Sequence, residues 1–516
     1  MRVLFFWMNL GCPVGISVGV GILSRELEEA GIGVKVIHLN EEVGYPYDED
    51  RIAADAADFL PDLFGISFGG NHVRQAKRLA GFLRGEFPGI KTICGGVQAT
   101  LTSEEVLSWP GVDYVCRGEA DGGRFVNFVK VLSEGGDTRR LQSFWAKGED
   151  GKIYENPIGP LPDISEQARL SFEAFDLEKI IRLNRGFAET LVGRGCPHRC
   201  AYCHNGAIIS LYKNRMEGGF RVSSYCRHRN VDNIIGELKE FTRRYPQIKA
   251  FILADDVLVS DMEWFRDFAR RYGAEVGLPF VSNASVRQID AEVAGLLKTA
   301  GCNMIKFGIE CGSERIRNEI LKKKVPTKRL FEAVGILQGH DINIRGYVML
   351  GNPTETIEDM LETYKMCADL RLDTTRTAIM YPYPGTEIYD FCRERDLLDE
   401  SISPPSYLTH SVLKWDAETG LFLKKSVAIN QWIMNVYLDN EASPEYKKLA
   451  DRVFGMSADE WDDPQVIPWI REQSVLMSRK FRELKVPHYF NPLSDRPDVA
   501  YLMKERKNRI INVDDF

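Results

Sequence analysis

The sequence predicts an α/β protein in three parts: a doubly wound, Rossmann-like domain over residues 1–135, a partial barrel of six strand-helix units over residues 186–400, and a helical part over residues 401–516. Short apolar runs alternate with amphipathic segments before residue 135 and again after residue 186. This alternation is typical of parallel sheets. Strand-like runs stop near residue 401, where helical stretches continue alone. A chain of 516 residues is also too long for a single hydrophobic core.

The first domain is expected to hold five parallel strands separated by helices. Helical periodicity covers residues 20–30, which end before Gly31, and residues 72–87. In such sheets a ligand binds beyond the carboxyl ends of the strands, near the point where the strand order switches. The expected strands are Arg2 to Met8, Gly33 to Leu39, Asp62 to Phe68, Ile90 to Cys94 and Val112 to Cys116.

Glycines lie at the ends of three of these strands. Gly69-Gly70 come after the third strand, Gly95-Gly96 after the fourth, and Arg117-Gly118-Glu119 after the fifth. A single pair of this kind usually makes a tight turn. Together they let a large flat ligand lie against the backbone, because glycine has no side chain to obstruct it.

Residues 136–185 are expected to connect the first domain to the barrel. The stretch "SFWAKGEDGKIYENP" reads as a hairpin around residues 148–151, and Pro157, Pro160 and Pro162 follow it.

The barrel is expected to hold six strands, five of which are followed by clear helical periodicity. Barrels of this class react at the carboxyl ends of their strands. The expected strands are Glu189 to Val192, Ala250 to Leu253, Leu278 to Ser282, Asn303 to Ile309, Asn343 to Leu350 and Thr374 to Met380.

Cys196, Cys200 and Cys203 follow the first barrel strand as Cys-x3-Cys-x2-Cys in "GRGCPHRCAYC". Three thiolates can bind three irons of a four-iron, four-sulfur (4Fe-4S) cluster and leave the fourth iron open to a small molecule. Gly195 gives the loop the freedom to bend around such a cluster. Tyr202 can offer a flat apolar face to a planar ring.

Zinc is the alternative metal for this loop. Cys200 and Cys203 form a Cys-x2-Cys knuckle that His198 or His204 could complete. No second knuckle or histidine pair follows at the spacing of a zinc site, which favours the iron-sulfur interpretation.

Polar residues or glycine also follow the next four barrel strands. Each position alone would more often be a helix cap or a turn. Because strand ends of a barrel share one rim, the set together favours a ligand. The positions are Asp255-Asp256, Ser282-Asn283, Glu310 and Gly351-Asn352.

The cysteine spacing resembles the signature of the radical S-adenosylmethionine (radical SAM) enzymes. The resemblance implies that SAM chelates the open iron, and that an electron from a donor such as flavodoxin or ferredoxin cleaves SAM to a 5'-deoxyadenosyl radical. It further implies SAM contacts by Asp255 at the methionine amino group and by Glu310, in "FGIECGS", at the ribose or methionine. Cys311 stands there where the family has serine. The remaining SAM contacts expected on this basis are Tyr202, Ser282 and Gly351, the last in "MLGNPTET".

Three segments of the first domain, "ISFGG", "CGGVQAT" and "VDYVCRGEAD", resemble the cobalamin-binding domain found in front of many radical SAM domains. Other cobalamin-binding families supply a histidine to cobalt after the first strand, but "WMNLGCPVG" contains none. Cobalt is therefore expected to lack a histidine from this loop, and Cys12 is a weak alternative ligand. The contacts implied by the resemblance are Ser67, Gly95, Gly96, Thr100, Gly118 and Glu119.

These resemblances imply a cobalamin-dependent radical SAM methyltransferase that methylates an unactivated carbon, or phosphorus, of a small-molecule or natural-product substrate through the deoxyadenosyl radical and methylcobalamin. One alternative is a cyclase, oxidative or ring-rearranging enzyme that uses the same cofactors without methyl transfer. A second is a cobalamin-binding sensor with an inactive barrel. A third, least favoured, is a methylthiotransferase with a second cluster at Cys12, Cys94 and Cys116. No residue is singled out as a catalytic proton donor.

Composition narrows the setting in which the protein works. The net charge of -8 argues against a nucleic-acid partner, and the basic runs at residues 227–229 and 322–324 are expected to be solvated. Eleven cysteines, an odd number, indicate a reducing compartment and hence the cytoplasm. No apolar stretch is long enough to span a membrane.

Overall fold

A seven-stranded sheet with the order β2-β1-β3-β4-β5-β6-β7 forms the amino-terminal part of the computed structural model. The first five strands are parallel, and β6 and β7 join the edge in antiparallel orientation. The five expected strands are therefore present, and the expected connector adds two more. The strands are β1 (Arg2–Met8), β2 (Gly33–Leu39), β3 (Leu63–Ser67), β4 (Lys91–Gly95), β5 (Tyr114–Cys116), β6 (Phe144–Lys147) and β7 (Ile153–Tyr154).

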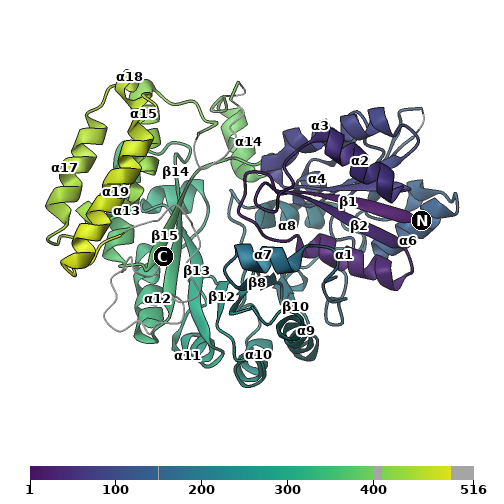
Figure 1. Cartoon of the computed structure of the whole chain (residues 1–516), viewed down its shortest axis with the longest axis horizontal. Helices are drawn as coiled ribbons and strands as arrows, with labels where there is room; N and C mark the ends of the chain where they lie inside the picture. The colour runs from purple at the N-terminus through teal and green to yellow at the C-terminus, as the bar shows by residue number, and fades with distance from the viewer. Residues whose placement is uncertain (149, 400, 403–409, 490–516) are drawn as a thin grey trace. The chain divides into compact units, whose positions relative to one another are not determined.

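Helices cover both faces of this sheet (Figure 1), with α2 (Glu49–Phe59) and α3 (Val73–Glu86) on one face and α1 (Val18–Glu29) and α6 (Arg124–Ser133) on the other. Because side chains alternate along a strand, Phe6 joins the buried core on one side while Phe5 lies 5.6 Å from the ring of Phe125 in α6. Helices α2 and α6 were not expected. Helix α2 has few apolar residues, and α6 is flanked by glycines, so the helical periodicity of either segment is not apparent in the sequence.

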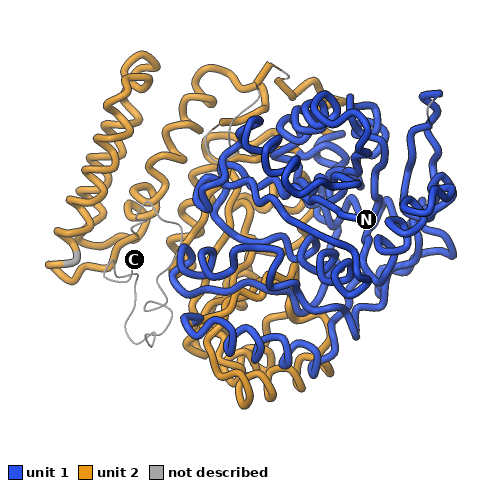
Figure 2. The backbone as a smooth tube through the Cα atoms, turned by 45° about the vertical axis from the view of Figure 1, so that its right-hand side comes forward, with its two compact units in different colours: residues 1–248, 383–390 blue, residues 249–382, 391–516 orange. Residues whose placement is uncertain are grey.

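The structure describes residues 1–148, 150–399, 401–402 and 410–489. They divide into two compact units (Figure 2). The first contains residues 1–248 and 383–390, and the second contains residues 249–382 and continues from residue 391. Besides the sheet, the first unit holds α4 (Val97–Leu101), α5 (Ser103–Ser108), α7 (Leu177–Leu183), β8 (Phe187–Thr190), β9 (Gly193–Arg194), α8 (His204–Arg215), β10 (Arg227–His228) and α9 (Val231–Arg244).

The second unit is built on a parallel sheet whose strands pair in chain order. It confirms the strand-helix alternation expected for the barrel. Its strands and their helices are β11 (Ala250–Leu253), α10 (Met262–Glu275), β12 (Phe280–Asn283), α11 (Ala291–Thr299), β13 (Cys302–Glu310), α12 (Thr327–Gly339), β14 (Asn343–Leu350), α13 (Ile357–Asp369) and β15 (Thr374–Ile379).

Between β13 and α12, Ile316–Ile320 form a single π-helical turn. Arg317 explains the irregularity, because its buried guanidinium donates to the carbonyls of Cys311, Gly312 and Val325. The turn is shaped around that side chain.

Over residues 410–489, the carboxyl-terminal part is helical, as expected. Within the second unit, Tyr364 of α13 donates a 2.9 Å hydrogen bond to the Ser426 carbonyl in α15. This bond joins the carboxyl-terminal helices to a helix of the parallel sheet. None of the helices over the described residues is long and apolar enough to cross a membrane. The helices are α15 (Ala417–Ala428), α16 (Asn430–Val436), α17 (Ser443–Phe454), α18 (Ala458–Trp461) and α19 (Val466–Glu483), and α15, α17 and α19 lie beside one another in Figure 1.

Candidate cofactor cavity and cysteine loop

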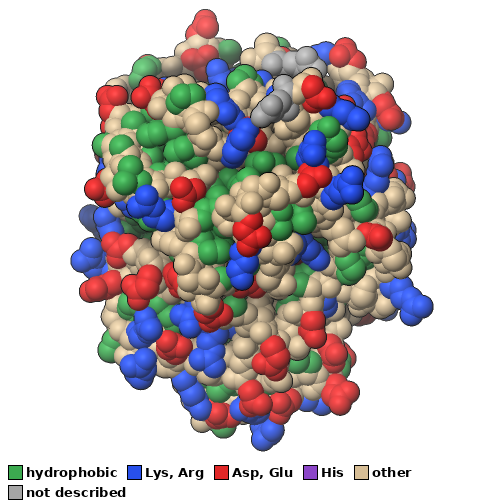
Figure 3. All heavy atoms as spheres, turned by 90° about the vertical axis from the view of Figure 1, so that its right-hand side faces the viewer, with side chains coloured by type: hydrophobic (Ala, Val, Ile, Leu, Met, Phe, Trp, Pro, Cys, Tyr) green, Lys and Arg blue, Asp and Glu red, His purple; other side chains and the backbone are tan. Residues whose placement is uncertain are grey.

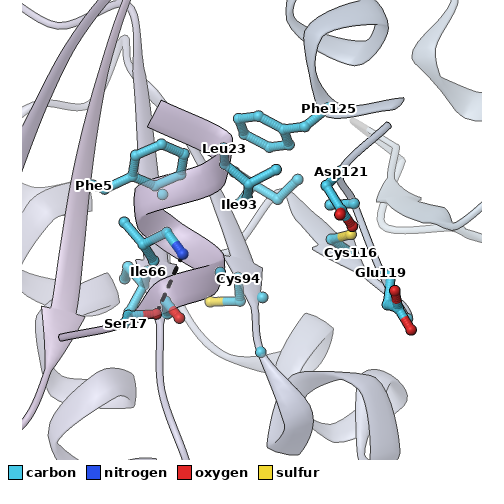
Figure 4. A pocket seen from close by; sticks show the side chains of 18 of the residues that line it. Phe5, Ser17, Leu23, Ile66, Ile93, Cys94, Cys116, Glu119, Asp121 and Phe125 are labelled. Atoms are coloured by element: carbon cyan, nitrogen blue, oxygen red, sulfur yellow. Dashed lines mark hydrogen bonds between the residues drawn. The ribbon is translucent and has the colours of Figure 1, made fainter. Parts of the chain in front are cut away.

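A cavity of about 250 Å³ lies toward the carboxyl ends of β1, β3, β4 and β5, against the first turns of α1 (Figure 4). One part of its wall is apolar, and the other carries charge. The apolar side chains are Phe5, Val20, Leu23, Ile66, Ile93 and Phe125. The charged ones are Glu119, Asp121 and Arg194. An apolar cavity with a few polar groups on one side is typical of cofactor sites.

Glycines keep the floor of the cavity open. A Cβ atom on Gly65 would come within 2.5 Å of the Phe5 ring. Gly96 has φ +98°, and a Cβ there would lie 2.8 Å from the Phe68 carbonyl oxygen. Both positions exclude larger residues, because protein atoms already occupy the space that a side chain would need.

Five of the six residues expected to contact cobalamin line this cavity: Ser67, Gly95, Gly96, Gly118 and Glu119. The sixth, Thr100, lies behind it. Its hydroxyl accepts a 3.0 Å hydrogen bond from the Gly118 N–H and donates one of 2.9 Å to the Gly96 carbonyl. Thr100 therefore fixes two lining glycines to each other.

Glu119 and Asp121 are held by arginines that the sequence analysis did not single out. Arg194 Nη1 lies 2.6 Å from Glu119 Oε2 and 3.0 Å from Asp121 Oδ1. Burial alone lowers the pKa of Arg194, but the two carboxylates outweigh it and raise that pKa above its ordinary value. Arg227 pairs with the other oxygen of Glu119. The Arg194 guanidinium stays charged, and both arginines anchor this wall.

The expectation that the basic run at residues 227–229 is solvated is wrong. Only 15% of the Arg227 side chain is exposed, and Arg229 is buried with its Nη1 atom 3.0 Å from Glu237 Oε1. Glu119, the partner of Arg227, lies far earlier in the sequence, and Glu237, the partner of Arg229, lies in the helix that follows. The basic run by itself therefore does not indicate these ion pairs.

The cysteine loop is bounded by two glycines that allow close backbone approach. Gly195 has φ +90°, and a Cβ there would lie 2.3 Å from the Tyr225 carbonyl oxygen. A Cβ on Gly206 would lie 2.8 Å from the Cys200 carbonyl oxygen. Cys203 is the N-cap residue of α8. The positive end of that helix dipole favours the negative charge of a thiolate-bound cluster.

Exposure separates the three cysteines of the loop from most others. Cys196, Cys200 and Cys203 are half-buried, whereas six of the remaining eight are buried. Burial raises the pKa of the Cys116 and Cys367 thiols to about 12, which disfavours the thiolate form that binds metal. The loop cysteines are thus accessible, as the ligands of a cluster must be.

Across the described part of the chain, no three His, Cys, Asp or Glu side chains are grouped as ligands of a single metal ion. A four-iron cluster differs from such a site because each cysteine binds a different iron. His204, one of the two histidines considered for zinc, packs its ring 4.6 Å from that of Tyr383, and burial lowers its pKa to about 4.

The segment 383–390 contacts both α4 and the cysteine loop. The Pro384 carbonyl accepts a 3.3 Å hydrogen bond from Gln98 of α4, and the Ile388 N–H donates one of 3.0 Å to the Ala201 carbonyl. No local pattern in the sequence indicates these contacts, because the partners lie far earlier in the chain.

The residues expected to contact SAM fall into two groups. Asp255, Ser282, Glu310 and Gly351 lie at or directly after the carboxyl ends of β11, β12, β13 and β14, which are neighbours in one parallel sheet. They therefore share one edge. Tyr202 lies in the cysteine loop of the other unit and is half-buried.

Ser282 and Glu310 each have a partner of their own. Ser282 donates a 2.9 Å hydrogen bond to the Leu253 carbonyl and so joins β12 to β11. Glu310, with φ +69°, places Oε1 at 2.9 Å from Lys323 Nζ. Gly351 also has positive φ, +70°, where its lack of a side chain is needed.

Glu355 is a further buried polar residue beside this edge. Its carboxyl accepts hydrogen bonds from the Asn352 N–H (2.8 Å) and from the Cys311 thiol (3.2 Å). Burial raises the pKa of Glu355 to about 7. Its motif "MLGNPTET" was noted in the sequence, but nothing there distinguishes this buried glutamate from an exposed one.

Comparison with known families matches both units. The model of the radical SAM superfamily matches residues 190–367, and that of the B12 binding domain matches residues 13–124. Together they cover the cavity, the cysteine loop and the strand ends described above.

Three curated proteins illustrate the range of relatives. The uncharacterized methyltransferase PH0819 of Pyrococcus horikoshii is 26% identical over 75% of this chain and 80% of its own. The cytidylyl-2-hydroxyethylphosphonate methyltransferase of Streptomyces wedmorensis is 22% identical over 74% of this chain and 78% of its own. The anaerobic magnesium-protoporphyrin IX monomethyl ester cyclase of Rubrivivax gelatinosus is 23% identical over 66% and 60%.

Two solved structures share the fold. The radical SAM methyltransferase TsrM of Kitasatospora setae, solved with cobalamin and a [4Fe-4S] cluster, superimposes with a TM-score of 0.62 at 18% identity over 76% of this chain and 78% of that one. The cobalamin-dependent enzyme OxsB gives 0.64 at 14% identity over 97% and 78%. The chain belongs to the radical SAM superfamily and carries a B12-binding domain in front of its radical SAM domain.

Proposed function

We propose that this protein is a cobalamin-dependent radical SAM methyltransferase. The observation that carries the proposal is the presence of a B12-binding match and a radical SAM match in one chain. The cavity accompanies the first match, and the cysteine loop lies within the second. Residues 1–135 form the cobalamin-binding domain, residues 136–185 the linker, residues 186–400 the barrel and residues 401–516 the helical domain.

Cys196, Cys200 and Cys203 hold the 4Fe-4S cluster in this proposal. Their half-buried positions and the flanking glycines support it. Asp255, Ser282, Glu310 and Gly351 contribute the SAM contacts from one sheet edge, with Tyr202 from the loop. Ser282 does so while it also joins two strands.

The cavity takes part of cobalamin. Its volume is about 250 Å³. The apolar wall of Phe5, Ile66 and Ile93 excludes water from that part, and Gly95 and Gly96 admit the ring system to the backbone beside it. Ser67, Thr100, Gly118 and Glu119 complete the contacts, Thr100 by holding Gly118 in place.

When bound, the three cofactors supply a deoxyadenosyl radical and a methyl group for transfer. The residues of this chain bind the cofactors, orient them and keep water away. The loop after β1 offers no histidine to cobalt, and Cys12, its one thiol, accepts a 3.4 Å hydrogen bond from Asn71 Nδ2. We therefore expect cobalt without a histidine from this loop.

The substrate is a small molecule, such as a natural product, and the electron donor is a small protein of the flavodoxin or ferredoxin type. Acidic and basic side chains are interspersed on the face drawn in Figure 3. That pattern supports a substrate other than nucleic acid, because phosphate backbones attract clustered basic surface. The cytoplasm, where thiols stay reduced, suits the cysteine content.

A second candidate function is ring formation or oxidation without methyl transfer. The likeness to the magnesium-protoporphyrin IX monomethyl ester cyclase favours it. These two methyltransferase relatives are matched over 80% and 78% of their own length, a larger share than for the cyclase relatives, which favours methyl transfer.

The test is anaerobic purification followed by incubation with reductant, hydroxocobalamin and SAM labelled in its methyl group. We expect 5'-deoxyadenosine and a cobalamin absorption spectrum that survives desalting. Absence of 5'-deoxyadenosine from protein that contains iron contradicts a radical SAM activity. With candidate substrates, an unlabelled product contradicts methyl transfer and supports the cyclase alternative.

A further inference from the structure

A set of contacts leads from the cavity wall to the cysteine loop inside the first unit. It begins at Glu119, which lines the cavity directly after β5. The two carboxylate oxygens of Glu119 each pair with a different arginine. Each arginine leads to a different cysteine of the loop.

The first arm runs through Arg194. This residue ends β9 and is followed in the chain by Gly195 and Cys196. Its guanidinium lies 2.6 Å from Glu119 and 3.0 Å from Asp121. Since Gly195 is packed against the Tyr225 carbonyl, the backbone between Arg194 and Cys196 has little room to move independently.

The second arm runs through Arg227. Arg227 of β10 lies opposite Arg194 of β9 in an antiparallel pair. Two residues earlier, the Tyr225 hydroxyl donates a 2.6 Å hydrogen bond to Asn205 Oδ1. The Asn205 amide in turn donates to Cys203 Sγ at 3.9 Å. Hydrogen bonds to ligand sulfurs shift the reduction potential of iron-sulfur clusters.

The cavity end of both arms is fixed independently. Glu26 of α1 accepts hydrogen bonds from the Gly122 N–H (2.8 Å) and the Gly123 N–H (3.3 Å), and Gln167 donates to Asp121. The loop after β5 is thus also held by contacts that do not involve the arginines. Because the rest of this loop is fixed, a ligand that displaces Glu119 would displace the two arginines with it.

Burial of these charges points to a positional role. The side chains of Glu119, Arg194 and Arg227 are between 15% and 18% exposed. Ion pairs removed from water contribute little net stability, because desolvation offsets much of their attraction. They do fix geometry, since moving one partner leaves the other charge unpaired.

We propose that Glu119, Arg194 and Arg227 are positioning residues that couple the cavity to the cysteine loop. Cobalamin in the cavity contacts Glu119 and changes its position. Through Arg194 this change alters the position of Cys196, and through Arg227 it alters the hydrogen bond to Cys203. Binding of cobalamin therefore changes the reduction potential of the cluster. The inference rests on the proposed function, since it requires both cofactors in the first unit.

The test compares the full-length wild-type chain with Arg194→Gln after anaerobic reconstitution of the cluster. Iron content, the Kd for hydroxocobalamin and the cluster midpoint potential, with and without saturating hydroxocobalamin, are measured by colorimetry, absorption titration and EPR-monitored redox titration. We expect the wild-type potential to shift on binding. Arg194→Gln should keep its iron, bind hydroxocobalamin about tenfold more weakly and show no shift at saturation.

Arg84→Gln is the matched control. Arg84 is a partly buried arginine that pairs with a carboxylate, Asp113, in the same unit without lining the cavity. Asp113 keeps Lys91 Nζ at 3.2 Å and the Thr92 N–H at 2.9 Å. This variant should shift its potential as the wild type does.

An unchanged shift in Arg194→Gln, or no shift in wild-type protein that binds both cofactors, overturns the coupling. Wild-type protein that binds no cobalamin overturns the proposed function instead, so the two failures are distinguishable. If Arg194→Gln loses its iron, Arg227→Gln is tested in its place. That variant should also show no shift of the cluster potential on cobalamin binding. Arg194→Lys, which retains the charge without the bidentate geometry, should restore part of the shift.

Discussion

The Thr100 hydroxyl accepts a 3.0 Å hydrogen bond from the Gly118 N–H, which ties α4 to the loop after β5. The same hydroxyl donates to the Gly96 carbonyl at 2.9 Å. Two of the glycines that line the cavity therefore depend on one threonine that does not line it.

Thr100→Val keeps the shape of the side chain and removes both hydrogen bonds. The half-buried Gly118 N–H loses its partner, which should lower the free energy of unfolding by about 1 kcal/mol and weaken hydroxocobalamin binding. Chemical denaturation and absorption titration measure the two effects. Thr102→Val is the control, because the Thr102 hydroxyl also donates to the carbonyl four residues earlier, at 3.0 Å, without reaching Gly118. Equal effects of the two changes on cobalamin binding would contradict the role given to Thr100.

Gly96→Ala should abolish cobalamin binding and destabilise the first unit. The added Cβ meets the Phe68 carbonyl oxygen at 2.8 Å, in a backbone conformation with φ +98° that alanine adopts only with strain. Gly81→Ala in α3 is the control, since no atom lies within 4 Å of its Cβ. There we expect unchanged binding and a gain of about 0.5–1 kcal/mol in stability. The thermal transition and the cobalamin absorption spectrum report both. Full binding by Gly96→Ala would contradict a backbone contact at that position.

Cys200→Ala should lose most of the iron and the 5'-deoxyadenosine activity, because a cluster with two cysteine ligands is not retained. Cys226→Ala is the control within the same unit, since Cys226 is also half-buried but lies outside the motif. It should keep its iron after anaerobic reconstitution. Iron analysis and the visible absorption spectrum distinguish the two variants. Loss of iron from Cys226→Ala alone would move the cluster away from the predicted cysteines.

Glu355 makes stability depend on pH. Its pKa is about 7 in the folded chain, against an ordinary value of 4.5. Between these values the folded state binds more protons than the unfolded state, so stability falls as the pH rises. The loss attributable to Glu355 is at most about 3 kcal/mol.

Glu355→Gln mimics the protonated carboxyl and should remove this part of the pH dependence. Denaturation midpoints at pH 5 and pH 7.5 measure it. Glu358→Gln, an exposed change in the first turn of α13, should leave the wild-type dependence intact. The assignment to Glu355 fails if the glutamine variant shows the same fall in stability as the wild type.

Much of the fold could be predicted, because the local periodicity of apolar residues indicates most of its strands and helices. The strands Ala250–Leu253 and Asn343–Leu350 have the predicted bounds, since short apolar runs flanked by polar residues end sharply. Helix α2 and the π-helical turn at Ile316–Ile320 were missed. The first has only two buried residues, and the second depends on a buried arginine whose partners the sequence does not reveal.

The sequence by itself determined the α/β class, the cysteine motif and the glycines at the strand ends, because spacing and the absence of a side chain are local properties. Only the tertiary structure decided which charges meet. Arg194 and Arg227 find Glu119 more than seventy residues earlier in the chain, and Tyr383–Asp390 lies against the cysteine loop. Ion pairs and backbone contacts between distant segments leave no periodic pattern in a single sequence, so folding has to bring the partners together before they can be recognised.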